Sequence, residues 1–228
     1  MERGRYQYLD WEKLLNDLYA IISKPGKGNI SPEAFLDRDA NLRFSELNGL
    51  LKKCALNDLN RWIAGHKAIR DYGKIVTGGH VDAVKGLADF VAVRNEAAHE
   101  ARRVTAPLGK NHLLDYVSLI DAVCTVISEY LDHTIVTLAK KTNSARGTAL
   151  VRHVYKRVGA LVVTAQEIDI NVGDELWAVG DLHCFRTVVK SICVGPLPVP
   201  KATVTTPQPL GLITDPLVRK GCTLVKYA

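Results

Sequence analysis

The chain has 228 residues, of which 47% are hydrophobic and 24% charged, so it can bury a sizeable core and has the charge content of a soluble protein. The net charge of +6 is spread over the chain without a basic tail, which excludes a global cationic field and leaves room for a local nucleic-acid patch. Five cysteines without a C-x-x-C pair argue against a zinc ribbon, and the apolar runs are too short for a membrane span. We therefore expect a cytoplasmic protein that has no membrane segment.

Residues 1–141 are predicted to form a bundle of helices because their apolar residues recur every three or four positions. The first helical segment runs from Trp11 to Ile22, and Ser31 before Pro32 is a plausible start for the next. A further helical segment carries Trp62, Ile63 and Ile69 before the "TGG" interruption.

The strongest helical signal follows "TAPLG" and carries two apolar stripes side by side. The first stripe consists of Leu113, Val117, Ile120, Cys124, Ile127, Leu131, Ile135 and Leu138. The second stripe consists of Tyr116, Leu119, Val123, Val126 and Tyr130. A helix that is apolar over so much of its circumference should be central in the bundle or should form a dimer interface.

The period of the apolar pattern changes to two after residues 142–150, "TNSARGTAL", which we interpret as the linker. Residues 151–228 contain about six short β-branched stretches separated by Gly and Pro. Short strands of this kind hide their edges by closing into a small barrel. The predicted fold class is therefore α+β, with an all-α helical bundle over 1–141 and a β-barrel over 151–228.

Several motifs of the second half are similar to the β-barrel domain that follows the GTPase domain in translation elongation factors. These are "VGDELWAVG", "VVKSICV", "GLITD" and "VRKGCTLVKY", in which a Gly-Asp or Gly-Cys step enters a strand. The similarity spans roughly residues 159–227 and implies the barrel fold.

The stretch 90–103, "FVAVRNEAAHEARR", turns polar where the helical pattern should stay apolar. Arg94 continues the apolar line of Leu87 and Val91. The neighbouring edge of the same helix consists of Ala88, Ala92, Asn95, His99 and then Arg102 or Arg103. The two alanines leave room there for another helix or a ligand.

The residue types in this stretch suit RNA cleavage in which the substrate 2′-hydroxyl attacks its own phosphate. His99 can transfer a proton near neutral pH, Arg94 can hold a phosphate and stabilise transition-state charge, and Asn95 can orient the imidazole or donate to an oxygen. This chemistry needs no metal and no cofactor. The alternative is a structural Arg–Asn–His network or a solvated helix end.

Spacing alone does not single out Arg94 and His99, because two other Arg–His pairs have a similar separation. The pair Arg61 and His66 lies in "RWIAGH", where a Trp replaces the polar neighbour, and Arg146 with His153 spans the linker and first strand. The remaining histidines His80, His112, His133 and His183 show no ligand spacing, and we interpret them as surface or core residues.

The segment "VRNEAAH" in its helical context resembles the signature of the HEPN superfamily, an α-helical bundle with an R-x(4–6)-H motif followed by a long closing helix. The resemblance implies a metal-independent endoribonuclease that leaves a cyclic phosphate and joins two motifs across a homodimer. Arg94 and His99 would then be catalytic, and Asn95 would support them. One group of HEPN toxins has a Tyr two positions after the His, where this chain has Ala101, so membership of that toxin–antitoxin group is not expected.

The leading hypothesis is a homodimeric HEPN endoribonuclease whose barrel recruits or senses RNA, either tRNA or single-stranded RNA. Arg102 and Arg103 would contact the RNA backbone. The resemblance adds an expected role in stress or phage defence and a regulatory protein or antitoxin as partner. The rival hypotheses are a non-catalytic HEPN module that binds nucleotide, RNA or protein, and a barrel-led adaptor whose helical half only dimerises.

Overall fold

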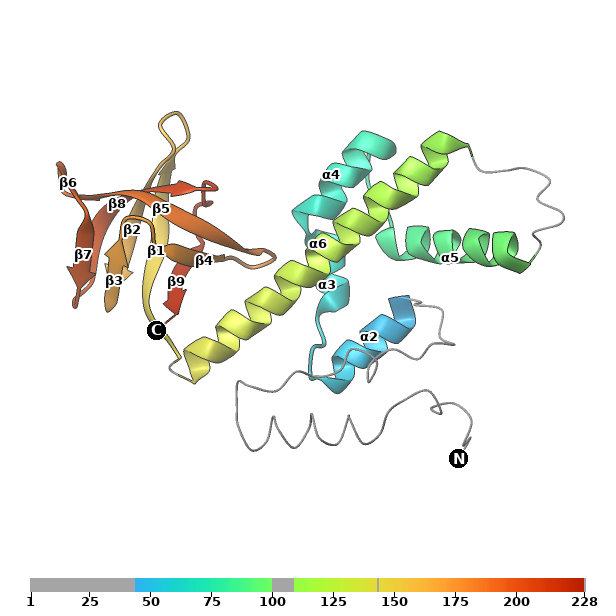
Figure 1. Cartoon of the computed structure of the whole chain (residues 1–228), viewed down its shortest axis with the longest axis horizontal. Coiled ribbons are helices and arrows are strands. Elements are labelled where there is room, and N and C mark those ends of the chain that lie inside the picture. Colours follow the sequence, from blue (N-terminus) through green and yellow to red (C-terminus); the bar gives the residue numbers. More distant parts are fainter. Residues whose placement is uncertain (1–43, 100–108, 143, 228) are drawn as a thin grey trace.

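The computed structural model describes residues 44–99, 109–142 and 144–227, and the side chains at 96–99, 146–147 and 227 lie outside that description. The helix expected from Trp11 to Ile22 and the helix start expected at Ser31 also lie outside it. The described chain consists of a helical part followed by a part made of strands (Figure 1). The α+β prediction is therefore confirmed.

The helical part is built around one long helix. The described helices are α2 (Phe44–Lys53), α3 (Leu59–Gly65), α4 (Lys67–Val76), α5 (Ala83–His99) and α6 (Lys110–Lys141). Helices α3, α4 and α5 pack directly against α6, and α2 packs against α5. Figure 1 shows α6 running the length of the bundle and reaching the strands with its C-terminal end.

The apolar segment expected around Trp62 and Ile69 forms two helices, with the break at His66. The backbone of His66 is extended, and its imidazole Nδ1 accepts a hydrogen bond from the backbone N–H of Ala68 at 3.1 Å. His66 thereby caps α4, which is why the first helix cannot continue through it. Gly65 lies where the barrel approaches, since a Cβ atom there would lie 2.3 Å from Cδ1 of Leu182.

The two apolar stripes of α6 have different environments. Leu119, Val123 and Val126 of the second stripe are buried against the other helices. The first stripe is largely turned to solvent, and Val117 and Ile135 keep 62% and 56% of their surface exposed. The prediction that α6 is central is confirmed, and the second stripe provides the core contact.

The strands form a closed barrel and a small ribbon. Their bounds are β1 (Ala145–Tyr155), β2 (Ala160–Gln166), β3 (Ile168–Asn171), β4 (Glu175–Val179), β5 (Cys184–Val194), β6 (Leu197–Val199), β7 (Lys201–Val204), β8 (Gln208–Asp215) and β9 (Thr223–Tyr227). Within residues 144–227, six strands pair in the order β4-β9-β1-β2-β8-β5, and β5 returns to β4. Closure pairs the edges that short strands would otherwise expose. Strand β6 pairs antiparallel with the end of β5, and β3 pairs with β7.

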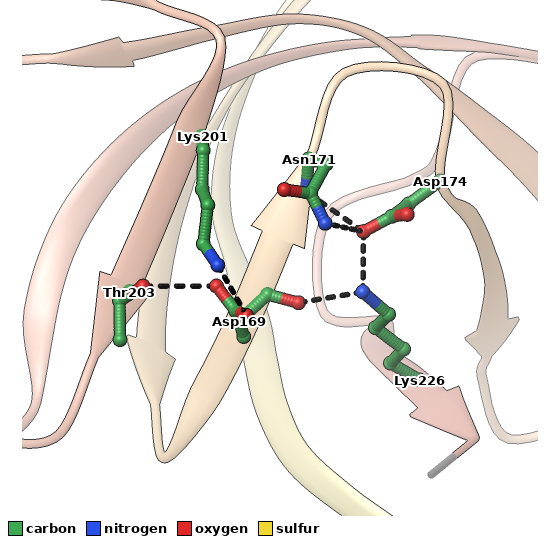
Figure 2. A network of polar contacts seen from close by, with 6 residues as sticks. All are labelled: Asp169, Asn171, Asp174, Lys201, Thr203 and Lys226. Atoms are coloured by element: carbon green, nitrogen blue, oxygen red, sulfur yellow. Dashed lines mark hydrogen bonds and ion pairs between the residues drawn. The ribbon is translucent and has the colours of Figure 1, made fainter.

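A polar network ties the β3–β7 ribbon to the barrel (Figure 2). Lys226 of β9 donates to the backbone carbonyl of Asp169 at 2.8 Å and also pairs with Asp174. Within the ribbon, Lys201 and Thr203 of β7 bind the Asp169 carboxylate of β3. These two partners hold the pKa of Asp169 below its ordinary value. We assign this network a structural role, because it holds the β3–β7 ribbon against the barrel.

The helical and barrel parts meet directly at the end of α6. Helix α6 ends at Lys141 and β1 begins at Ala145, so the strand occupies most of the segment 142–150 in which a linker was expected. The N–H of Ser144 bonds to the carbonyl of Ala139 at 2.9 Å, which turns the chain back at once. Val136 of α6 is buried with Cys184 and Val225 of the barrel.

Candidate active site on helix α5

Helix α5 has an apolar first half that is held against α6. Asp82 precedes the helix and accepts a hydrogen bond from the N–H of Lys85 at 3.0 Å, which satisfies one of its first donors. Further along, the ring of Phe90 lies 5.3 Å from that of Tyr116 in α6. The polar residues follow this anchored half, at the same end of the bundle as the first turn of α6 (Figure 1).

Arg94 and Asn95 form the polar pair that the sequence singles out. Both are described, and Arg94 is exposed while Asn95 is half-buried. Nη2 of Arg94 donates a hydrogen bond to Oδ1 of Asn95 at 2.9 Å. Asn95 thereby orients the guanidinium group of Arg94, and its expected role beside the His99 imidazole stays a prediction, because that imidazole lies outside the described residues. An oriented, exposed guanidinium is suited to bidentate contact with a phosphate.

His99 is the last residue of α5, and its side chain lies outside the described residues. Arg102 and Arg103 lie outside them as well. Residues five apart on a straight helix point about 140° apart. We therefore predict that Arg94 and His99 of one α5 point in different directions, although the His99 side chain itself lies outside the described residues.

An apolar groove runs along the edge of α5 that ends at Asn95. Its volume is about 500 Å³, and its walls come from α2 and α5. Its lining includes Phe44, Leu87, Ala88, Val91, Ala92 and Asn95. The room that Ala88 and Ala92 were expected to leave is therefore present beside Asn95.

The competing pair Arg61 and His66 has structural roles. Nη2 of Arg61 lies 2.8 Å from Oδ1 of Asp181 in the turn between β4 and β5. His66 caps α4 and is only 3% exposed. The two side chains are thus committed to different partners, although their spacing equals that of Arg94 and His99.

A second polar cluster lies where the bundle meets the barrel, and sequence reasoning missed it. Oε2 of Glu129 in α6 accepts a hydrogen bond from the backbone N–H of Cys184 at 2.9 Å and lies 3.2 Å from Nε2 of His66. Burial by itself raises the pKa of Glu129, but His66 and the Cys184 N–H outweigh it and hold that pKa below its ordinary value. The sequence holds one signal for this cluster: Glu129 places a carboxylate between the apolar positions Val126 and Tyr130, which are both buried.

His133 and His183 belong to this junction and are half-buried there. The ring of His133 lies 5.2 Å from that of Trp62, and Nε2 of His183 lies 2.9 Å from Sγ of Cys222. Burial lowers the pKa of both histidines, and for His133 it outweighs the opposing effect of Asp181.

We expect acidification from pH 8 to pH 5.5 to destabilise the folded protein through these histidines. A histidine whose pKa is lowered on folding contributes stability above its ordinary pKa and loses it as the pH falls below that value. The urea midpoint should fall over this range, and the fall should be smaller in His133→Gln. The exposed His112→Gln is the matched control, and an equal fall in His133→Gln and wild type would contradict the expectation.

Two further findings concern membrane-spanning helices and metal-binding groups among the described residues. None of the described helices is both long and apolar enough to cross a membrane. The described residues also hold no group of three or more His, Cys, Asp or Glu side chains placed to bind a metal ion.

The barrel is similar to a known small domain at low identity. The C-terminal domain of a Geobacillus thermoleovorans protein described as a U32 peptidase is 18% identical, with a TM-score of 0.30 over 38% of this chain and 96% of that domain. Its selenomethionine variant gives 17% identity and the same TM-score over 36% and 98%. Neither is an elongation-factor domain, so the resemblance to that barrel stays a prediction.

The helical part matches a family model. No curated protein matches the chain. The model described as RiboL-PSP-HEPN matches residues 2–133, which is more than half of the 228 residues and includes α2 to α5 and most of α6. The expected HEPN-type domain is thereby confirmed, and the chain belongs to the RiboL-PSP-HEPN family.

Proposed function

We propose that the protein is a metal-independent endoribonuclease whose active site is completed by two copies of α5 in a homodimer. The observation that carries the proposal is the exposed Arg94 guanidinium held by Asn95 near the end of α5, with His99 on the same helix. Membership of a HEPN family supports a nuclease or RNA-related module at this place.

The proposed reaction uses proton transfer and charge stabilisation. A His99 imidazole takes the proton of the RNA 2′-hydroxyl as its oxygen attacks the adjacent phosphorus. The P–O bond to the 5′-oxygen then breaks, and that oxygen takes the proton back from the same His99, which is now an imidazolium. The products are a 2′,3′-cyclic phosphate and a 5′-hydroxyl. Arg94 stabilises the added negative charge on the phosphorus oxygens, and Asn95 keeps Arg94 in place.

The dimer is proposed from two features. Arg94 and His99 diverge by about 140° on one helix, so a second α5 can supply the missing partner. In addition, α6 exposes Leu113, Leu114 and Val117 near its start, and Val117 is 62% exposed. This end of α6 lies at the same end of the bundle as the end of α5 (Figure 1). A two-fold contact there would bring both copies of α5 together.

The test is cleavage of tRNA and single-stranded RNA by the purified protein in EDTA. We expect cleavage to persist in EDTA, and we expect His99→Ala to reduce it by about 10²–10⁴-fold, the usual contribution of a general acid–base group. The exposed His80→Ala, in the turn before α5, is the matched control and should keep wild-type activity.

Absence of cleavage, or equal cleavage by wild type and His99→Ala, would contradict the proposal. RNA binding without cleavage would instead indicate a non-catalytic HEPN module. A role in stress or phage defence, restrained by a regulatory partner, belongs to the same proposal and rests on the family resemblance. Contacts of Arg102 and Arg103 with the RNA backbone also remain part of it.

A further inference from the structure

The hairpin formed by β1 and β2 presents exposed aromatic rings on its outward side. His153 and Tyr155 flank Val154, which packs on the barrel core, so both rings point away from that core. The two ring centroids lie 4.5 Å apart, and 52% of the Tyr155 surface is exposed. Figure 1 shows the turn of this hairpin projecting beyond the rest of the barrel. Adjacent exposed rings on a strand are surfaces on which unpaired bases stack.

Cationic side chains lie directly beside the two rings. Arg152 precedes His153 at a β-bulge, and its Nε donates a hydrogen bond to Oγ1 of Thr164 at 3.2 Å. This bond fixes the guanidinium on the outward side, because Thr164 alternates with the buried residues of β2. Lys156 and Arg157 lie in the turn at the end of β1, and both are exposed. The rings therefore lie between one cation on the strand and two in the turn.

The cations of this hairpin are not balanced by carboxylates. Among the described residues, none of Arg152, Lys156 and Arg157 forms an ion pair. Other cations of the described chain do pair with carboxylates, namely Arg61, Lys67, Arg186, Lys201 and Lys226. The sequence has no Asp or Glu between Asp132 and Glu167, and six Lys and Arg residues lie in that interval. Such a local excess of positive charge attracts a polyanion.

The strands next to the hairpin continue its outward side with small and apolar residues. Val162 of β2 is paired in register with Gly211 of β8, where no side chain rises above the sheet. Ile213 lies two positions further along β8 and is 39% exposed. Lys190, an exposed bulge residue of β5 beside Ile213, offsets the negative charge of Asp215 at the end of β8. A flat apolar surface with cations at its margin leaves room for an extended chain of nucleotides.

We propose that a single-stranded segment of RNA binds the hairpin face, which consists of Arg152, His153, Tyr155, Lys156 and Arg157. Its bases stack on the two rings, and its phosphates bind the three cations. A duplex conceals the faces of its bases, so exposed rings favour a single strand. The hairpin face lies in the barrel, outside the residues that match the family model, and takes no part in the proposed cleavage. The choice of RNA over DNA rests on the proposed function, because the barrel would hold the substrate of the α5 site.

Fluorescence anisotropy of the full-length protein with a labelled 2′-O-methyl RNA tests the proposal. The probe is a single strand of about 12 nucleotides, within the usual site size of small barrel domains, and it cannot undergo 2′-hydroxyl attack. Tyr155→Ala should weaken binding by about 5- to 100-fold, the usual effect of losing one stacked base. Tyr155→Phe keeps the ring and should bind within about twofold of wild type, which separates stacking from any effect on folding.

The contribution of the cations is measured with a double variant of the turn, Lys156→Gln with Arg157→Gln. It should bind more weakly, and the slope of log affinity against log salt concentration should fall by about 1.4, or about 0.7 for each lost phosphate contact. Lys52→Gln with Lys53→Gln is the matched control, because these adjacent exposed lysines at the end of α2 carry the same charge but lie in the helical bundle. This control should bind as wild type does.

Several outcomes would overturn the proposal. These are no binding of RNA, binding that is unchanged in both Tyr155→Ala and the turn variant, an equal loss in the α2 control, and a duplex of the same sequence bound as tightly as the single strand. Binding of phosphatidylserine vesicles that depends on Tyr155, without binding of RNA, would instead identify the hairpin face as a membrane-binding surface. His99→Ala should bind the probe as wild type does, so failure of the cleavage proposal and failure of this one are distinguishable.

Discussion

A heterodimer of one Arg94→Ala subunit and one His99→Ala subunit is expected to keep about half of the wild-type cleavage activity, because one of two symmetric sites stays complete. Each variant alone should lose about 10²–10⁴-fold. The expectation follows from the proposed two-chain site, in which His99 of one subunit works with Arg94 of the other. The heterodimer is isolated by coexpression with two affinity tags, and cyclic-phosphate product is measured in EDTA.

The reciprocal arrangement is the control. A wild-type subunit paired with a subunit carrying both substitutions has no complete pair across the interface, so it should be inactive. If Arg94 and His99 acted together within one subunit, the results would be reversed: this second heterodimer would be half active and the first inactive. That reversed outcome would contradict the two-chain site while leaving the ribonuclease proposal intact.

Much of the fold could be predicted because each half has one dominant period. Leu161, Val163 and Ala165 alternate into the barrel core, and Leu119, Val123 and Val126 follow the helical repeat into the bundle core. The choice between the two stripes of α6 could not be predicted, because both have helical spacing. The contacts of α3, α4 and α5 decide it, and these depend on how the helices are arranged in space.

The junction between bundle and barrel was beyond sequence reasoning for the same reason. Glu129 meets Cys184 and Arg61 meets Asp181 across 55 and 120 positions of the chain, and no local pattern encodes such pairs. Gly65, next to the break at His66, leaves room for Leu182 of the barrel, a contact that no local pattern encodes either. His183, which we interpreted from the sequence as a surface or core residue, lies half-buried at this junction beside Cys222.

The candidate site could be predicted where it depends on neighbours along one helix. The room beside Ala88 and Ala92 follows from helical geometry and is present. The Arg94–Asn95 hydrogen bond was not predicted, because residues one position apart on a helix do not ordinarily face each other. The roles of His99, Arg102 and Arg103 stay predictions, since their side chains lie outside the described residues.

Val117→Arg is expected to convert the protein to a monomer and to reduce RNA cleavage by about 10²-fold or more, since the loss of a two-chain site removes the proton-transfer group from the bound phosphate. Val117 lies on α6 about one turn after Leu113 and Leu114, and 62% of its surface is exposed. In a symmetric interface the substituted arginine would meet its own copy or apolar surface, and either contact is unfavourable. Sedimentation analysis and cleavage in EDTA measure the two effects.

Ile75→Arg is the matched control, because Ile75 is also a β-branched residue exposed on a helix, with 84% of its surface accessible on α4. It should stay dimeric and active. Circular dichroism should show wild-type helix content for both variants, since neither side chain is part of a buried cluster. A Val117→Arg protein that remains dimeric would place the interface elsewhere. A monomeric Val117→Arg protein with full activity would show that one subunit suffices for cleavage, because the dimer and the active site would then be separate properties of the chain.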